Sequence, residues 1–436
     1  MRRGAVTVAW VTAASLAAVT LAGCGGATPG VPTEPGTDAQ PTKASVAPAK
    51  TADPPLQFAT AGVTLPKAAL RANLAGSAVS RFMTLRERTA YIVASDKLSA
   101  VDVLTGKENW SVGIEGRPAD PYAQSGPFVN PVGPRPPAVT DKLAAAAVAT
   151  AEPGQGTTPG FTALTVVAAD TASGTKAWQA KVKVATDTYG GGGQGSITKV
   201  AAISDKAVVA SYSHSDKSFT VALDAATGAT LWERHDYEAG SLNGNVLVGK
   251  DSNVAENKSM NQATAVDVAT GAQLWVGATR ASQLSVVPSD PALVVVNRTD
   301  YGSGKPSLVF LDPASGAAKG ELKGAGGFGS RAYGDCYHDQ QSVLVCTNDG
   351  RVTGYDSKTA QQLWTLPDQA ANRIAPSVVT VWHGALYGKV GGKPIVLDAK
   401  TGKDVSTTVE IAPVWVSQYA GIAVDSNGDP KAFPVK

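Results

Sequence analysis

One nine-residue pattern recurs seven times in this chain of 436 residues and constrains its fold more than any other feature. The pattern is Asp-x-x-[Thr/Ser]-[Gly/Ala]-x-x-x-Trp, and its copies begin at Asp102, Asp170, Asp224, Asp267, Asp312, Asp356 and Asp398. The last position holds Trp110, Trp178, Trp232, Trp275 and Trp364, whereas Gly320 and Ser406 replace the Trp in the fifth and seventh copies. Successive copies lie 68, 54, 43, 45, 44 and 42 residues apart. A repeat of this length is typical of architectures in which each unit packs on its neighbours.

The residue types of the pattern predict a tight turn between two strands. Each copy follows a β-rich run such as residues 219–223. Asp can accept hydrogen bonds from backbone N–H groups two or three residues further on, and Gly adopts the left-handed conformation readily. The Trp then lies on the returning strand, where its ring can fill the wedge between two units. Four short strands per unit, repeated at this period, predict a β-propeller.

The repeats resemble the PQQ-like (pyrroloquinoline quinone-like) propeller repeat, as residues 221–232 (VALDAATGATLW) show. The same repeat occurs in quinoprotein dehydrogenases, in extracellular sensor domains and in the propeller lipoprotein of the outer-membrane β-barrel assembly machine. The scaffold of the chain is similar to that of this last lipoprotein. The resemblance implies the fold, whereas the function has to be argued from the site.

The strand pattern predicts an all-β, eight-bladed propeller of four-stranded antiparallel blades. Seven blades follow from the seven turns. Residues 411–417, 421–425 and 431–435 then read as three more strands, with an Asn427-Gly428 hairpin turn between the last two. Residues 56–65 are expected to supply the missing outer strand and to close the ring. Seven blades with a C-terminal extension is the alternative.

The N-terminal residues predict export and lipid attachment. Arg2 and Arg3 precede an apolar run over residues 5–21, which is typical of a secretory signal peptide. The run ends in LAGC, which resembles the lipobox of bacterial lipoproteins, so we expect residues 1–23 to be the signal peptide and Cys24 to be acylated. Residues 24–55 are rich in Pro, Thr, Ala and Gly without an apolar period and predict a disordered linker. Residues 56–436 form the propeller domain.

Cysteine and charge counts add two expectations. Once Cys24 carries lipid, Cys336 and Cys346 remain, and a disulfide between them is expected in an exported protein; two buried free thiols are the alternative. The 38 Lys and Arg residues nearly balance the 36 Asp and Glu residues, so nucleic acid is not an expected partner.

The long insertions predict which face of the propeller binds a partner. With strands A to D numbered from the inside outward, the A–B and C–D turns share one face, here called the turn face, and the B–C and D–A loops share the other, the loop face. Residues 115–137 and 184–195 lie between blades, and 151–160, 251–261 and 297–306 lie between B and C strands, so all five are assigned to the loop face. Tolerated length variation is the alternative explanation. The candidate contact residues on the loop face are Arg117, Tyr122, Phe128, Arg135, Tyr189, Arg298 and Tyr301.

A quinoprotein dehydrogenase would need calcium ligands, basic groups for the PQQ carboxylates and an aspartate base. No such set is recognised in the sequence, and the paired adjacent cysteines of those enzymes are missing, so no catalytic, cofactor-binding or metal-binding residue is assigned. Binding of PQQ with Ca²⁺ stays open. Two polar clusters are explained more simply: residues 233–238 as a solvated loop, and Asp335, His338 and Asp339 as a polar turn.

We therefore expect an extracytoplasmic lipoprotein that the acylated Cys24 anchors to the plasma membrane, or to the outer membrane in a Gram-negative cell. Its propeller is expected to bind another envelope protein or an extended peptide without catalysing a reaction. The alternative is a quinoprotein-like enzyme or a sensor that binds a small molecule at the central channel.

Overall fold

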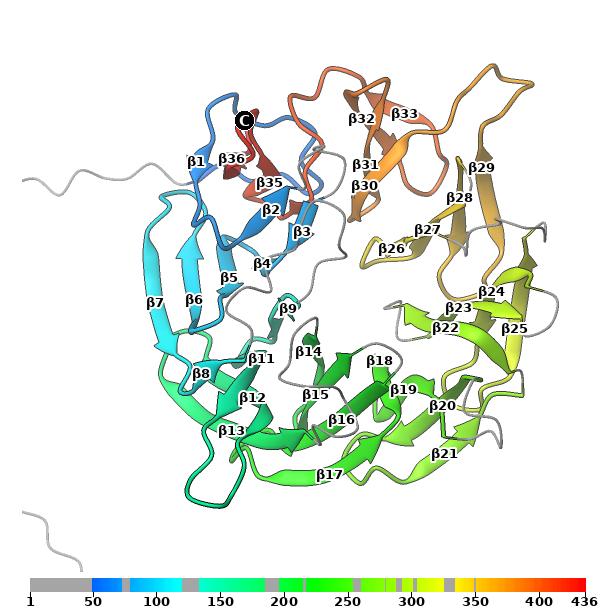
Figure 1. The fold of residues 1–436 in the computed structure, drawn as a ribbon. Helices are drawn as coiled ribbons and strands as arrows, with labels where there is room; N and C mark the ends of the chain where they lie inside the picture. Colours follow the sequence, from blue (N-terminus) through cyan, green and yellow to red (C-terminus); the bar gives the residue numbers. More distant parts are fainter. Residues whose placement is uncertain are drawn as a thin grey trace, which may run out of the picture. The chain divides into compact units, whose positions relative to one another are not determined.

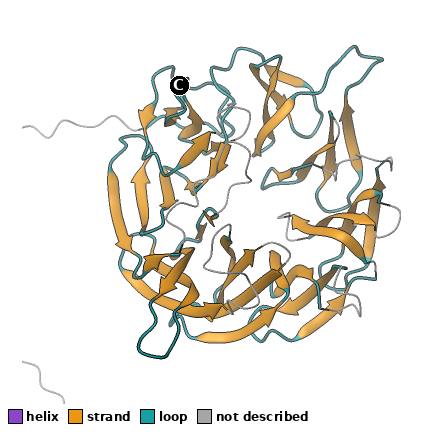
Figure 2. Cartoon of the chain, in the orientation of Figure 1, coloured by secondary structure: helices purple, strands orange, loops and turns teal. Residues whose placement is uncertain are grey.

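Eight blades arranged in a ring form the computed structural model (Figure 1). The structure describes residues 49–72, 79–119, 133–184, 196–214, 217–253, 260–278, 280–287, 292–300, 304–324, 334–348 and 350–436. Within these ranges the regular elements are strands (Figure 2), and no helix long and apolar enough to cross a membrane occurs. The predicted all-β, eight-bladed propeller is confirmed.

Blades 1 to 4 follow one another along the chain. From the innermost to the outermost strand they are β4 (Met83–Arg86), β5 (Thr89–Val93), β6 (Lys97–Asp102) and β7 (Glu108–Gly113) in blade 1; β10 (Ala138–Val139), β11 (Leu143–Glu152), β12 (Phe161–Asp170) and β13 (Lys176–Val184) in blade 2; β14 (Ile197–Ile203), β15 (Ala207–His214), β16 (Lys217–Asp224) and β17 (Thr230–His235) in blade 3; and β18 (Tyr237–Asn243), β19 (Val246–Asp251), β20 (Gln262–Asp267) and β21 (Gln273–Val276) in blade 4.

Blades 5 to 7 continue the same order. Their strands are β22 (Ala281–Val287), β23 (Val294–Asp300), β24 (Pro306–Leu311) and β25 (Ala318–Lys323) in blade 5; β26 (Cys336–His338), β27 (Val343–Asn348), β28 (Arg351–Asp356) and β29 (Gln362–Leu366) in blade 6; and β30 (Ser377–Trp382), β31 (Ala385–Val390), β32 (Lys393–Asp398) and β33 (Asp404–Ser406) in blade 7.

Blade 8 joins the two ends of the propeller. Its strands are β34 (Trp415–Val416), β35 (Ala420–Val424), β36 (Pro430–Pro434) and, on the outside, β1 (Val63–Thr64). Val63 lies opposite Ala432 in this antiparallel pair, and Phe58 forms a further bridge to Val435. Residues 56–65 therefore supply the outer strand that closes the ring.

The core is divided among the seams between neighbouring blades. Within the described residues, the buried hydrophobic side chains form eight clusters, and each cluster combines side chains from two adjacent blades. In β15, Val208 and Ala210 face blade 2, whereas Ala207 and Val209 face blade 4. Because a blade is covered on both faces, its middle strands are apolar at consecutive positions instead of alternating.

The repeated Asp residues organise the C–D turns as predicted. Asp224 Oδ1 accepts the backbone N–H of Ala226 at 3.1 Å and both the N–H and the hydroxyl of Thr227 at 2.8 Å. These hydrogen bonds from Thr227 hold the pKa of Asp224 below its ordinary value, because they favour the ionised carboxylate.

Each repeated Trp packs against the turn of the following blade. Trp178 Nε1 donates a hydrogen bond of 3.0 Å to the carbonyl of Ala225, and a Cβ atom placed on Gly228 would lie 2.7 Å from the Trp178 ring. Gly228 also has a φ of +72°, so this position needs glycine for two reasons. The same contact joins Trp110 to Gly174, Trp178 to Gly228, Trp232 to Gly271, Trp275 to Gly316 and Trp364 to Gly402.

Four short strands were not predicted. β2 (Leu70–Ala72) and β3 (Val79–Arg81) form a two-stranded sheet. β8 (Arg117–Pro118) pairs with β11, as does β10, so the insertion at 115–137 interrupts the inner strand of blade 2. Its assignment to a loop before that strand was therefore wrong. β9 (Gly133–Pro134) leaves blade 2 and pairs in parallel with the inner edge of β14 in blade 3 (Figure 1).

Candidate binding face and inter-blade pocket

The loop face carries the long connections that have described strands at both ends. Residues 153–160 join β11 to β12, residues 252–261 join β19 to β20, and residues 301–305 join β23 to β24. All three are B–C connections, as expected, although the third is shorter because β23 extends to Asp300.

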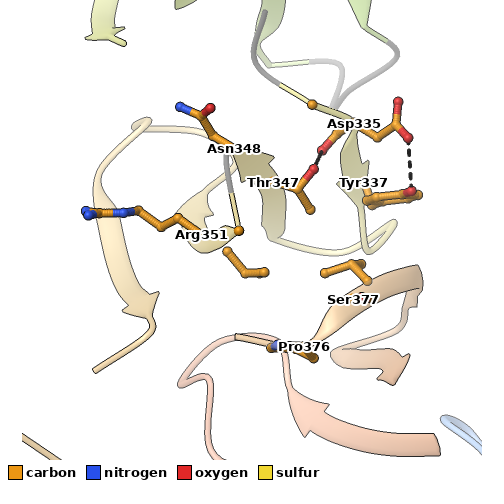
Figure 3. A pocket seen from close by; sticks show the side chains of 11 residues that line it. Asp335, Tyr337, Thr347, Asn348, Arg351, Pro376 and Ser377 are labelled. Carbon is orange, nitrogen blue, oxygen red and sulfur yellow. Dashed lines mark hydrogen bonds between the residues drawn. The ribbon is translucent and has the colours of Figure 1, made fainter. Parts of the chain in front are cut away.

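A pocket of about 460 Å³ opens on the loop face between blades 6 and 7 (Figure 3). This size falls within the usual range for small-ligand pockets. Three segments line it: the beginning of β26, the β27–β28 hairpin and the beginning of β30. The lining residues are Gly334, Asp335, Tyr337, Thr347, Asn348, Gly350, Arg351, Val352, Pro376, Ser377 and Val378.

The wall formed by blade 6 is held by internal hydrogen bonds. The Tyr337 hydroxyl donates to Asp335 Oδ2 at 3.4 Å, and the Asp335 carbonyl accepts the backbone N–H and the hydroxyl of Thr347 at 3.0 and 3.3 Å (Figure 3). Burial raises the pKa of Tyr337 to about 12, so its hydroxyl stays neutral and can act as donor and acceptor.

Three other polar side chains point to a binding role. Asn348, Arg351 and Ser377 make no side-chain hydrogen bond or ion pair with the part of the chain that the structure describes. Together they offer donors, an acceptor and a positive charge around one hollow. A ligand with a polar backbone could use all of them at once.

The predicted disulfide is present beside this pocket. Cys336 and Cys346 lie opposite each other in β26 and β27, with 4.1 Å between their Cα atoms. Cys346 also lines a second hollow of about 260 Å³ on the other side of blade 6, toward blade 5, and Asn348 and Arg351 border both hollows. The disulfide therefore supports the hairpin that separates the two.

The candidate contact residues on the loop face differ in their exposure and in their contacts. Arg117 begins β8 and is exposed, Arg135 follows β9 and is partly buried, and Arg298 of β23 bonds Ser307 at 2.9 Å and Glu321 at 2.8 Å within blade 5. Tyr122, Phe128, Tyr189 and Tyr301 lie outside the described residues. The described ones do not line the pocket between blades 6 and 7. The sequence signal nearest to that pocket was the pair Cys336 and Cys346, because the strand that carries Cys346 leads into the hairpin at Gly350.

Residues 233–238 do not form a solvated loop, and that interpretation was wrong. β17 ends at His235 and β18 begins at Tyr237, so only Asp236 separates blade 3 from blade 4. Tyr237 is fully buried and its hydroxyl donates to the carbonyl of Leu247 at 3.1 Å. Arg234 pairs at 2.6 Å with Asp251, whose side chain is also buried. Because a single residue connects the two blades, Tyr237 lies at the junction and packs into the seam between blades 3 and 4.

The other polar cluster is a turn, as expected. Asp339 Oδ1 accepts the backbone N–H groups of Gln341, Ser342 and Val343 at 2.9, 2.8 and 2.8 Å. Asp335 lies at the opposite end of β26, so the two carboxylates do not converge. Among the residues the structure describes, no three His, Cys, Asp or Glu side chains form a metal-binding group.

Comparisons with known proteins complete the description. The family model described as "Outer membrane protein assembly factor BamB" matches residues 162–333 and 326–413, which together exceed half of the chain. No curated protein sequence matches this chain.

Several solved structures share its general architecture. A europium-containing methanol dehydrogenase aligns with a TM-score of 0.47 and 11% identity over 85% of this chain and 83% of that chain. A quinohemoprotein alcohol dehydrogenase from Comamonas testosteroni aligns with a TM-score of 0.49 and 10% identity over 86% of this chain and 75% of that chain. The Dos1 propeller aligns with a TM-score of 0.47 and 12% identity over 79% of this chain and 84% of that chain. Likenesses at this level carry no information on activity.

Proposed function

Because the chain belongs to the PQQ-like repeat family described as outer membrane protein assembly factor BamB, we propose that it is a non-enzymatic protein-interaction platform of the cell envelope. In this proposal the loop face binds an envelope protein through an extended segment, and the pocket between blades 6 and 7 receives part of that segment. Acylated Cys24 anchors the platform on the extracytoplasmic side of the plasma membrane, or of the outer membrane in a Gram-negative cell.

The observation that carries the proposal is the set of polar groups around the pocket. Asn348, Arg351 and Ser377 come from two blades, and their side chains make no hydrogen bond to the described residues. A peptide backbone alternates donors and acceptors, and side chains of this kind recognise it without requiring a particular sequence. Since the blades are rigid, the partner meets a preformed surface and only its own segment has to be ordered.

The chain offers its own example of strand addition. β9 lies along the inner edge of β14, with Gly133 opposite Ile197 and Pro134 opposite Thr198. An inner blade edge can therefore accept an extended segment in parallel orientation. This arrangement supports recognition of a partner by main-chain hydrogen bonds as well as by pockets.

The position of the first described residues fits an anchored platform. The N–H of Ala52 donates to the carbonyl of Gln418 at 3.0 Å, and Asp53 pairs with His383 at 2.6 Å. Gln418 and His383 both lie in A–B turns, so residues 52 and 53 contact the propeller on the turn face. The loop face is on the opposite side of the blades from these contacts.

A photocrosslinking residue placed at Ser377 in cells tests the platform role. We expect the crosslinker at position 377 to give discrete protein adducts. The same crosslinker in place of Lys107, on the turn face, is expected to give none. Adding Arg351→Glu to the protein that carries the crosslinker at position 377 is expected to abolish its adducts. Arg280→Glu, which makes the same charge change at another exposed loop-face position, is expected to keep them. Equal adducts at both faces would contradict the proposal.

Two further measurements address the remaining parts of the proposal. Metabolic labelling with an alkyne fatty acid is expected to mark the wild type but not Cys24→Ser. Titration of the purified protein with PQQ and Ca²⁺ is expected to leave the absorbance and the melting temperature unchanged. Saturable binding with a raised melting temperature would instead favour the quinoprotein-like enzyme or sensor.

A further inference from the structure

A cluster of four charged side chains occupies the loop-face end of the seam between blades 3 and 4. It consists of Lys199 in β14, Glu238 in β18, Lys250 in β19 and Arg135, which follows β9; we call it the basic cluster. Lys199 Nζ lies 2.9 Å from Glu238 Oε1, and Lys250 Nζ lies 3.0 Å from Glu238 Oε2. One carboxylate is thus shared by two ammonium groups.

The charges in this cluster do not balance. Burial acts to raise the pKa of Glu238, but Lys199 and Lys250 outweigh it and hold that pKa at about 2, so Glu238 carries one negative charge at physiological pH. Lys199 and Lys250 pair with it, and Arg135 is near enough to interact with it electrostatically. The side chains of Lys199, Lys250 and Glu238 are only 25%, 20% and 28% exposed, so water screens this excess incompletely.

The neighbouring ion pairs do not supply the missing negative charge. Arg234 pairs with Asp251 at 2.6 Å, and Lys217 with Asp236 at 3.6 Å. Each of these pairs is neutral by itself. The excess positive charge therefore belongs to the basic cluster.

Arg135 is held in place by its backbone while its side chain lacks a partner in the described structure. The parallel pairing of β9 with β14 continues through the Arg135 N–H, which donates to the carbonyl of Thr198 at 2.7 Å. Its guanidinium makes no hydrogen bond or ion pair to the described residues. Burial lowers the pKa of Arg135, although nearby Glu238 acts in the opposite direction. A partly buried guanidinium gains most from a planar oxyanion that accepts two of its N–H groups.

We propose that the basic cluster is a binding site for an oxyanion, either a carboxylate or a phosphate group, which Arg135 holds in a bidentate pair while Lys199 and Lys250 complete the charge balance. Glu238 keeps the two ammonium groups apart and oriented, and it limits the site to one added anion. This site is distinct from the pocket between blades 6 and 7, so it stands or falls independently of the platform role.

Isothermal titration calorimetry of the full-length protein in detergent tests the site, with inorganic phosphate in one arm and succinate in the other at constant ionic strength. We expect saturable binding of at least one of them at a single site. Arg135→Gln is expected to weaken it at least tenfold, and Arg135→Lys is expected to lie between Arg135→Gln and the wild type, because it keeps the charge but loses the planar fork.

The matched control is Lys393→Gln, which removes one positive charge from an exposed loop-face position in blade 7. It is expected to change the affinity less than twofold. Binding of phosphate alone would identify a phosphate ligand, and binding of succinate alone a carboxylate ligand. Absence of saturable binding to the wild type, or equal weakening by Arg135→Gln and Lys393→Gln, would overturn the proposal.

Glu238→Gln supplies a change in the opposite direction. Removing the carboxylate that competes for both lysines is expected to tighten anion binding at least threefold. Weaker binding in this variant, with an unchanged circular dichroism spectrum, would also contradict the proposed arrangement.

Discussion

Gly320 of blade 5 lies opposite Ala360 of blade 6, and a Cβ atom on Gly320 would be 3.9 Å from the Ala360 Cβ. Gly320 occupies the position that Trp fills in most other repeats, and Ala360 occupies the position of the turn glycine on which that Trp would lie. The two departures from the repeat are complementary, since the missing ring removes the need for a glycine in the facing turn. Ala360 keeps a positive φ of 60°, so the turn itself is unchanged.

The complementarity predicts a coupled pair of substitutions. Gly320→Trp alone is expected to destabilise the protein by about 1–3 kcal/mol, because the ring meets the Ala360 methyl group. With Ala360→Gly added, the double variant is expected to be more stable than the sum of the two single changes by about 1 kcal/mol. Urea unfolding of all four proteins measures this coupling; strictly additive changes would show that the two residues do not interact.

Gly228→Ala is expected to cost about 2–4 kcal/mol, because the added methyl group would have a positive φ and would lie 2.7 Å from the Trp178 ring. Gly244→Ala is the matched control, since Gly244 also has a positive φ, of 62°, but has open space around its Cβ position. The control is expected to lose only about 1 kcal/mol. Similar denaturation midpoints for the two variants would contradict a packing role for this glycine.

Closure of the ring depends on Phe58, which is fully buried between blades 7 and 8. Phe58→Ala is expected to lower the free energy of unfolding by about 3–5 kcal/mol. The nearby Leu56 is 36% exposed, and Leu56→Ala is expected to change stability by less than about 1 kcal/mol. Thermal unfolding distinguishes the two variants, and an unaffected Phe58→Ala protein would mean that ring closure does not depend on the packing of Phe58.

Glu238 predicts a specific loss of stability in acid. Its pKa is about 2 in the folded protein and 4.5 as the reference value, so the folded state binds its proton less readily than the unfolded state. The contribution is therefore present above about pH 4.5 and is lost as the pH falls toward 2. It amounts to about 3 kcal/mol for a shift of this size. The difference in unfolding free energy between the wild type and Glu238→Gln, measured from pH 7 to pH 3, is expected to shrink; a constant difference would contradict this pairing.

The repeat made much of the fold predictable, because its information is local. Asp224 bonds groups two and three residues away, and Trp232 follows it at the same distance as in the other copies that keep the Trp, so the turns and the seams follow from one short pattern. The closing strand was also predictable, because the C-terminal residues supply only three strands of blade 8 and a four-stranded blade needs one more from elsewhere in the chain. These features need no knowledge of which distant residues meet.

The candidate sites depended on distant contacts and were largely hidden. Arg135 was selected as a loop residue, but its pairing beside Thr198 requires a chain excursion from blade 2 to blade 3 that no local pattern encodes. Residues 233–238 looked solvated because their charges alternate, whereas the one-residue step at Asp236 buries Tyr237 and places Glu238 between two lysines. The pocket between blades 6 and 7 is lined by three separate segments of two blades, and no local pattern shows that these segments meet.

The pairing of Val63 with Ala432 also sets an order of events during synthesis. β1 emerges among the first strands, and its partner β36 emerges among the last, so the paired positions Val63 and Ala432 are 369 residues apart in the sequence. Blades 1 to 7 can therefore begin to form while translation continues, but the circle cannot be completed until nearly the whole chain is available. Until then β1 remains an unpaired strand, and the face of blade 1 that packs on blade 8 lacks its neighbour. Ring closure is thus the step at which an incomplete or truncated chain is distinguished from a finished one.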